Sequence, residues 1–185
     1  MLTRDEALER VRAQNPDIGL FHHALASEAV MRALAEKMGE DVELWGITGL
    51  VHDVDFPLTK DEPAKHGVVA QDLLGDLPEE ARGAILAHNG EMTGTMPSGR
   101  FDYALRCAET VTGLISAAAL VRPEGLHGMQ AKSLKKKMKD KAFAASVNRD
   151  NIRECEHIAM TLDEFLELAV AAMLPLEKEL GLAKS

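Results

Sequence analysis

The chain has little of what marks several large classes of protein. Only two of its 185 residues are cysteines, Cys107 and Cys155, and their separation forms no redox or metal-binding pair. No apolar stretch approaches about 18 residues without a charge or a turn residue, and the N-terminus lacks the basic and then apolar order of a signal peptide. These features disfavour a disulfide-stapled secreted protein and a membrane protein, and they predict a location in the reducing cytoplasm.

Aromatic and β-branched residues are also scarce. Aromatic residues make up 4% of the chain, and valine and isoleucine number 17 against 50 for alanine and leucine. Unbranched side chains lose little rotamer freedom in a helix, and no segment alternates apolar and polar residues as a strand does. A chain of this length fits one domain. We therefore predict an all-α, single-domain helical bundle over residues 1–185.

Start and stop signals divide this bundle into helices. Capping boxes at Thr3–Glu6 and Thr161–Glu164 mark two starts, Asp41 caps a third helix, and Gly39 ends the helix before it. Residues 54–62 and 90–100 have the composition of loops. The helices are expected over residues 3–14, 18–38, 41–53, 63–75, 78–88, 101–121, 130–139, 142–147 and from 161 onward.

Charge is distributed unevenly along the chain. The 21 basic and 30 acidic residues give a net charge of −9, yet residues 122–153 contain nine basic and three acidic side chains. An acidic protein with one basic segment is a poor general binder of nucleic acid polymers, because phosphate contacts dominate that affinity. A solvated helix face is the plain interpretation of such a segment. The alternative is that it binds a small phosphorylated substrate.

Six side chains that can bind a divalent metal follow one another within 87 residues: His23, His52, Asp53, His66, His88 and Glu109. Imidazole and carboxylate groups without thiolate suit a borderline or hard metal that activates water. Four of the six are expected on buried helices or at their ends, where an unpartnered titratable group is costly. The sequence therefore predicts one shared metal site. Helix geometry alone does not decide whether His22 or His23 faces it.

The order of these residues resembles the motifs of the HD-domain superfamily of metal-dependent phosphohydrolases. Residues 21–26 (FHHALA) are similar to the first motif, and residues 49–54 (GLVHDV) to the His-Asp motif. Residues 65–67 (KHG) and 87–89 (AHN) resemble the extra histidines of two-metal members. Residues 104–109 (ALRCAE) resemble the last motif, with glutamate in place of the usual aspartate. The resemblance covers about residues 18–121 and leaves 122–185 as a helical extension similar to that of small bacterial HD-domain proteins.

The resemblance implies one or two divalent transition metals, chosen from Mn, Fe, Zn and Ni. The first metal would be held by His23, His52, Asp53 and Glu109. A second metal would be held by His66 and His88, with Asp53 bridging both ions as the catalytic residue. Independently of the resemblance, we predict that Asn89, Lys132, Lys136 and Arg149 receive phosphate oxygens of the substrate if the basic segment folds over the cleft.

The implied reaction is hydrolysis of a phosphoester or phosphoanhydride by metal-activated water, and the expected partner is a small phosphorylated substrate such as a nucleotide or dinucleotide. Two alternatives use the same ligands. One is a di-iron oxygenase, and the other is a non-catalytic metal- or ligand-binding module. The sequence does not fix the substrate, the native metal or the oligomeric state.

Overall fold

The computed structural model describes residues 2–14 and 17–184, and within these ranges the chain forms helices and turns but no strand. The prediction of an all-α fold is therefore confirmed. The sequence predicts that the Asn15-Pro16 pair ends the first helix, but this pair lies outside the described residues. No helix in the described part of the chain is long and apolar enough to cross a membrane.

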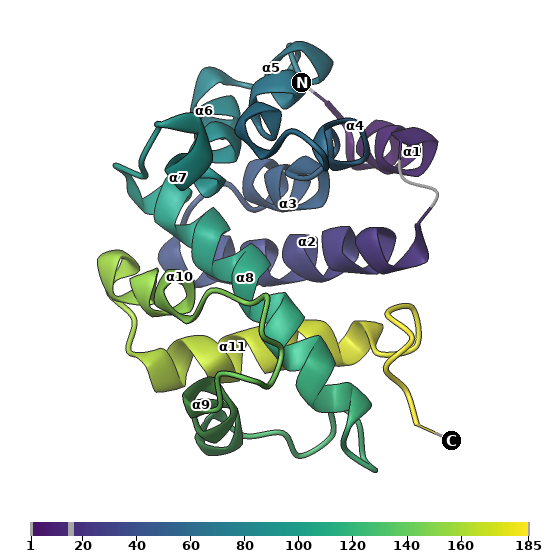
Figure 1. The fold of residues 1–185 in the computed structure, drawn as a ribbon, viewed down its shortest axis with the longest axis vertical. Coiled ribbons are helices and arrows are strands. Elements are labelled where there is room, and N and C mark those ends of the chain that lie inside the picture. The colour runs from purple at the N-terminus through teal and green to yellow at the C-terminus, as the bar shows by residue number, and fades with distance from the viewer. Residues whose placement is uncertain (1, 15–16, 185) are drawn as a thin grey trace.

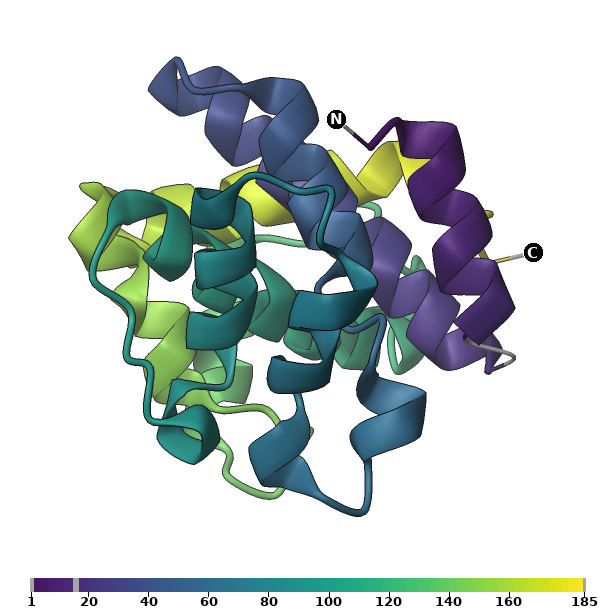
Figure 2. The ribbon, with the colours of Figure 1, turned by 90° about the horizontal axis from the view of Figure 1, so that it is seen from above.

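The helix α2 (Ile18–Met38) lies at the centre of the molecule (Figure 1). The helix α3 (Val42–Val51) packs along one side of it and α11 (Leu162–Met173) along the other, while α8 (Arg100–Leu120) crosses in front. The helix α1 (Arg4–Gln14) lies beside α2 and α3 (Figure 2). Met31 from residues 18–121 and Phe165 from the extension, residues 122–185, are examples of buried side chains that belong to one core cluster. The extension therefore packs onto the same core as residues 18–121.

Side-chain caps start α3 and α11 where the sequence predicts them. Asp41 accepts a hydrogen bond from the Leu44 backbone amide, and Thr161 and Glu164 form a reciprocal capping box. At the other end of α2, Gly39 adopts φ 72°, a left-handed conformation that glycine reaches without strain. These caps supply partners for backbone groups that a helix end leaves unpaired.

Short elements connect α3 to α8: α4 (Phe56–Thr59), the 3₁₀ turn η1 (Pro63–Lys65), α5 (Val68–Leu73), α6 (Glu79–His88) and α7 (Gly90–Thr93). The predicted helix over 63–75 is wrong, because the chain breaks at His66 and Gly67. Gly67 adopts φ 86°, and the buried Asp55 carboxylate accepts hydrogen bonds from the backbone amides of Gly67 and Ala70. The predicted loops 54–62 and 90–100 contain α4 and α7.

The rest of the extension consists of α9 (Ala131–Lys139), α10 (Arg149–Arg153) and the 3₁₀ turns η2 (Glu154–Ile158) and η3 (Leu174–Leu176), in addition to α11. The predicted helix over 142–147 is wrong, since residues 141–146 form turns. The Arg149 guanidinium donates hydrogen bonds to four backbone carbonyls in this segment, those of Asp140, Phe143, Ala144 and Val147. The Arg149 side chain therefore donates the hydrogen bonds that backbone amides would donate to these carbonyls in a helix.

Candidate metal centre

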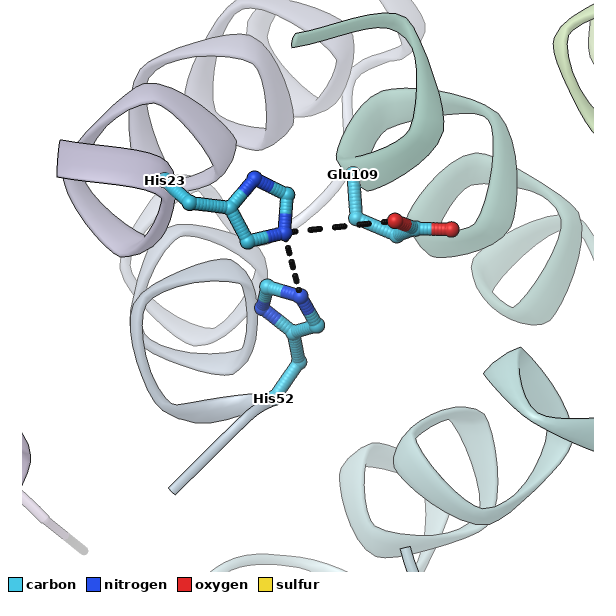
Figure 3. Close-up of side chains that lie close together, drawn as sticks. All are labelled: His23, His52 and Glu109. Carbon is cyan, nitrogen blue, oxygen red and sulfur yellow. Dashed lines mark hydrogen bonds and ion pairs between the residues drawn. The ribbon is translucent and has the colours of Figure 1, made fainter. Parts of the chain in front are cut away.

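Three of the predicted ligands meet from three long helices. His23 projects from α2, His52 follows the last residue of α3, and Glu109 lies in the middle of α8 (Figure 3). The Nε2 atoms of His23 and His52 are 3.2 Å apart, and a Glu109 carboxylate oxygen lies 4.0 Å from His23 Nε2. We call His23, His52 and Glu109 the first triad.

Close packing of α2 on α3 brings His23 and His52 together, and it depends on Gly49. A Cβ atom at this position would lie 2.8 Å from the backbone carbonyl oxygen of Ser27 on α2. The Gly49 carbonyl also accepts a hydrogen bond from His52 Nδ1 at 2.8 Å. Gly49 thus permits the helix spacing and orients the ring of His52.

The remaining three predicted ligands form a second triad. Asp53 lies just after α3, His66 follows η1, and His88 is the last residue of α6. The Nε2 atoms of His66 and His88 are 2.9 Å apart, and one Asp53 oxygen lies 3.1 Å from His66 Nε2 and 3.5 Å from His88 Nε2. The structure therefore brings all six predicted ligands into two adjacent groups.

Asp53 connects the two triads. One of its oxygens lies 3.6 Å from His23 Nε2, and the other lies 3.4 Å from His52 Nε2. The same carboxylate therefore approaches histidines of both groups, which is the position that a bridging ligand between two metal ions would occupy.

Backbone carbonyls fix the ring protonation of two of the histidines. His52 Nδ1 donates to the Gly49 carbonyl, and His88 Nδ1 donates to the Ile85 carbonyl. A carbonyl can only accept, so the proton must reside on Nδ1 in both rings. The Nε2 lone pair of each ring is left to bind a cation.

Side chains hold the Nδ1 atoms of the other two histidines. His66 Nδ1 lies 2.9 Å from an oxygen of Asp55, and His23 Nδ1 lies 2.9 Å from the hydroxyl oxygen of Thr112. The Thr112 hydroxyl donates its own proton to the Glu109 backbone carbonyl, so it accepts from His23. All four imidazoles thus present Nε2 to the centre of the site.

The donor set fits a divalent metal. Zinc and similar ions bind imidazole nitrogen at about 2.1 Å, so two such ligands lie about 3 Å apart at right angles and about 3.4 Å apart at the tetrahedral angle. The separations of 3.2 Å and 2.9 Å between facing Nε2 atoms agree with this spacing. Lone pairs that face each other at such distances repel unless a proton or a metal lies between them. Nitrogen and carboxylate oxygen suit Mn, Fe, Zn or Ni.

Burial and charge shift the protonation of the metal-free ligands. Burial lowers the pKa of His52 to about 3, so this ring is neutral near pH 7. Burial also lowers the pKa of His66, but Asp53 and Asp55 outweigh this effect and raise it to about 10. Burial raises the pKa of Asp53, but His52 and His66 outweigh it, and the pKa lies well below its usual range. Burial raises the pKa of Glu109.

Asp55 is a functional residue that the sequence analysis missed. Its side chain is fully buried, with one oxygen on His66 Nδ1 and the other on the amides of Gly67 and Ala70. A carboxylate on the far nitrogen of a metal-binding histidine fixes the orientation of the ring. The HDxD pattern at residues 52–55 was the available signal, but the turn that brings His66 back to Asp55 was not predictable.

Asn89, a predicted phosphate contact, has its amide nitrogen engaged by the protein. This nitrogen donates to the backbone carbonyl of Pro63 at 2.8 Å and to that of His66 at 3.1 Å. Asn89 therefore holds the turn that carries His66, and it would have to release these bonds to donate to a substrate.

The adjacent His22 points away from the triads. It lines a surface depression with Arg4 and Phe21, and its ring lies close to Gly181 of the C-terminal segment. Of the two neighbouring histidines, His23 is the one that approaches His52.

Two cavities that share lining residues lie beside this centre, and one of them is lined by His23 and Glu109 of the first triad. The first, which we call the metal cavity, has a volume of about 320 Å³ and is lined by His23, Glu109, Thr110, Gly113, Ser146, Val147, Asn148 and Asn151. The second, the basic cavity, has a volume of about 600 Å³ and shares Val147 and Asn148 with the first. Its charged lining residues are Lys139, Lys141, Arg149, Asp150 and Arg153. Positive charge therefore lies one residue layer away from the candidate metal position.

The basic segment contributes to the site with different residues from those predicted. Lys132 and Lys136 are exposed on α9 and line neither cavity. Arg149 borders the basic cavity, but its guanidinium binds backbone carbonyls. Lys139 and Lys141, at the end of α9 and in the following turn, are the lysines that line the basic cavity.

Comparison with known proteins agrees with this geometry. The family model for the HD domain matches residues 20–142, well over half of the chain. The match continues beyond Val121 and includes α9. No curated protein and no solved structure matches the chain. Because the family model covers the helices that carry both triads, the chain belongs to the HD domain family.

Proposed function

We propose that this protein is a metal-dependent phosphohydrolase that hydrolyses a phosphoester or phosphoanhydride, of a nucleotide or dinucleotide. The observation that carries the proposal is the convergence of four Nε2 atoms, each on a ring whose Nδ1 is held by a partner, around the Asp53 carboxylate. An arrangement of this kind serves a cation rather than a hydrogen-bond network.

The first triad would hold one divalent ion and the second triad another, with Asp53 shared between them. Bound divalent ions lower the pKa of a coordinated water and stabilise charge on phosphoryl oxygens. The residues around the site keep its donors in place: Gly49 and Thr112 orient the first pair of histidines, and Asp55 and Ile85 orient the second pair. Preorganised donors do not need to rearrange during the reaction.

The basic cavity supports a substrate that carries more than one negative charge. Lys139, Lys141 and Arg153 line it, and Asp150, which pairs with Arg153, offsets part of their charge. A nucleotide whose reacting phosphoryl lies in the metal cavity would extend its other anionic groups past Val147 and Asn148 into this basic cavity. Lys132, Lys136 and Arg149 remain predicted contacts, with the two lysines placed for long-range attraction only.

Metal analysis of gently purified protein, followed by a panel of nucleotides and phosphoesters with the metal found, tests the proposal. We expect one to two transition metals per chain and hydrolysis of at least one phosphate compound. His22→Ala provides a matched control for His23→Ala, because the two histidines are adjacent and only His23 approaches the triads.

The same experiment separates the alternatives. Oxygen uptake by anaerobically iron-loaded protein, without phosphate release, would favour a di-iron oxygenase. Protein that retains metal but transforms neither phosphate compounds nor oxygen would favour a binding module. A metal content that is equal in wild type, His23→Ala and Asp53→Ala would contradict the metal assignment itself.

A further inference from the structure

The metal cavity contains one buried polar side chain whose hydrogen-bonding capacity the protein leaves half unused. Asn151, on α10, is only 9% exposed and lines this cavity together with His23 and Glu109. Its Oδ1 atom accepts a hydrogen bond from Arg106 at 3.1 Å. Among the described residues, no group accepts a hydrogen bond from its amide nitrogen. The amide nitrogen is therefore free to donate to a molecule that enters the cavity.

Arg106 fixes which end of the Asn151 amide faces the cavity. A guanidinium has only donors, so the atom that faces it must be the amide oxygen, and the nitrogen must take the other direction. The usual ambiguity between the two ends of an asparagine side chain is therefore resolved by chemistry.

Arg106 is itself held rigidly. It is 1% exposed, and its guanidinium binds Glu91 and Glu154 with donor–acceptor distances between 2.7 and 3.0 Å. Charge-assisted, bidentate contacts of this kind fix geometry as well as adding energy. Asn151 thus receives its orientation from a buried, fully paired arginine.

We propose that the Asn151 side-chain amide binds the substrate by donating a hydrogen bond to a non-bridging phosphoryl oxygen in the metal cavity. The inference rests on the proposed function. A phosphoryl oxygen is the acceptor that best matches a neutral donor beside the metal ligands, because Glu109 and Asp53 already supply the negative charge of the site. The donor would hold an oxygen that the metal ions do not reach.

Asn89 and Asn151 differ in one decisive respect. The Asn89 nitrogen is occupied by two backbone carbonyls, whereas the Asn151 oxygen is occupied and its nitrogen is free. Asn89, which adjoins His88, is the asparagine that we predicted from the sequence. Asn151 lies 42 positions after Glu109, in the basic segment, where the sequence pattern indicates positive charge but no particular role for an asparagine.

The test uses inorganic phosphate, the product of the proposed reaction, with zinc-loaded full-length protein freed of excess metal. Asn151→Asp keeps an oxygen towards Arg106 but places a negative charge where the donor was. We expect phosphate affinity to fall by about tenfold or more, because a hydrogen bond to a charged group is lost and a repulsion is gained. Asn151→Ala should weaken binding about tenfold without the added charge.

Asn148→Asp is the matched control, since it adds the same charge to the lining of the same cavity. Asn148 caps α10 through its oxygen, a contact that aspartate retains. Calorimetry should show a smaller loss of phosphate affinity for this variant than for Asn151→Asp. Equal losses in the two variants would mean that general repulsion explains the effect, and the proposal would be wrong.

A measurement on the wild-type protein does not depend on how the variants fold. The ¹⁵N side-chain amide signal of Asn151, identified by its absence from the Asn151→Ala spectrum, should shift when phosphate is added. An unmoved signal at saturating phosphate would overturn the inference. Phosphate binding through Asn151 without hydrolysis of any phosphate compound would leave the inference standing and refute the proposed function. Hydrolysis with unchanged phosphate affinity in both Asn151 variants would do the reverse.

Discussion

The two triads of the metal centre are built on different kinds of scaffold. The first triad is positioned by three long helices, α2, α3 and α8, whose packing at Gly49 fixes the separation of His23 and His52. The second triad depends on a helix end and a turn, in which Asp55, Gly67 and Asn89 hold His66. Helix packing is a property of the whole core, whereas a turn depends on a few hydrogen bonds. We therefore expect the first metal position to be robust and the second to be sensitive to single changes.

The largest effect should come from Asp53, the residue that the two triads share. Asp53→Ala removes the carboxylate that approaches histidines of both groups, so metal content should fall at both positions. Loss of a direct ligand should reduce hydrolysis by more than about 100-fold, the upper range seen when only outer partners are changed. Mass spectrometry of bound metal and circular dichroism provide the measurements. Full metal content in a folded Asp53→Ala variant would show that Asp53 is not a ligand shared by the two metal positions.

Replacing one histidine in each triad compares the positions directly. His66→Ala should lower the metal content towards one per chain, because the first triad stays complete. His23→Ala should instead empty the first position, which is supported by the long helices. If His66→Ala binds as many metal ions per chain as the wild type, the site is mononuclear. The first triad would then hold the only metal ion of this site.

Asp55 tests whether the turn alone controls the second position. Asp55→Asn preserves the size of the side chain but removes its charge from His66 Nδ1, and the second metal should bind about 10- to 100-fold more weakly. Asp61→Asn, in the exposed part of the same loop, is the control. Competition with a chelator measures both variants. Equal affinities for the second metal in wild type and Asp55→Asn would show that the ring is oriented by packing instead.

The second position should also depend more strongly on pH than the first. In the metal-free protein the pKa of His66 is raised to about 10, so a metal must displace a proton there, whereas burial lowers the pKa of His52 to about 3. Affinity for the second metal should therefore rise by up to about tenfold per pH unit below pH 10.

The stability of the metal-free protein should change with the opposite sign. The raised pKa of His66 contributes stability that is complete below its unfolded value of 6.5 and is lost as the pH rises towards 10. Chelator competition between pH 6.5 and 8.5 tests metal affinity, and thermal unfolding of the chelated protein tests stability. A second-metal affinity that does not change with pH would be incompatible with a protonated His66.

The smallest effect concerns the two pairs of lysines in the basic segment. Lys139 and Lys141 line the basic cavity, so replacing both with alanine should raise KM for a polyphosphate substrate several-fold with little change in kcat. The effect should shrink at high salt, because exposed charges are screened over about 8–10 Å. Replacing Lys132 and Lys136 should leave KM nearly unchanged. Steady-state kinetics at two salt concentrations distinguishes the two pairs. Equal effects of the two double substitutions on KM would favour the interpretation of the basic segment as a solvated helix face.

The fold class and the six residues that the structure brings together could be predicted from the sequence, because both leave a recognisable sequence pattern. Alanine and leucine at helical spacing and capping residues such as Asp41 lie within short windows, and the candidate ligands occur in short motifs in a family-like order. The break at Gly67 could not be predicted in the same way, because it depends on Asp55, a residue from before the turn.

The hydrogen bond between Arg106 and Asn151 could not be predicted from the sequence for a related reason. The contact joins residues 45 positions apart, and it is set by the packing of α10 on α8. The lysines of the basic segment show the same limit. Composition identified the positive charge, but the turn that Arg149 holds determines which side chains reach a cavity.

The buried Arg106 also determines where this chain could be divided. The HD domain match ends at residue 142, yet Arg106 within it pairs with Glu154 and with Asn151 beyond it. A fragment that stopped at residue 142 would retain both triads, but it would remove Glu154 and Asn151 from Arg106 and uncover a guanidinium that is only 1% exposed in the whole chain. For anyone who trims or fuses this protein, the family boundary is therefore not a place where it can be cut.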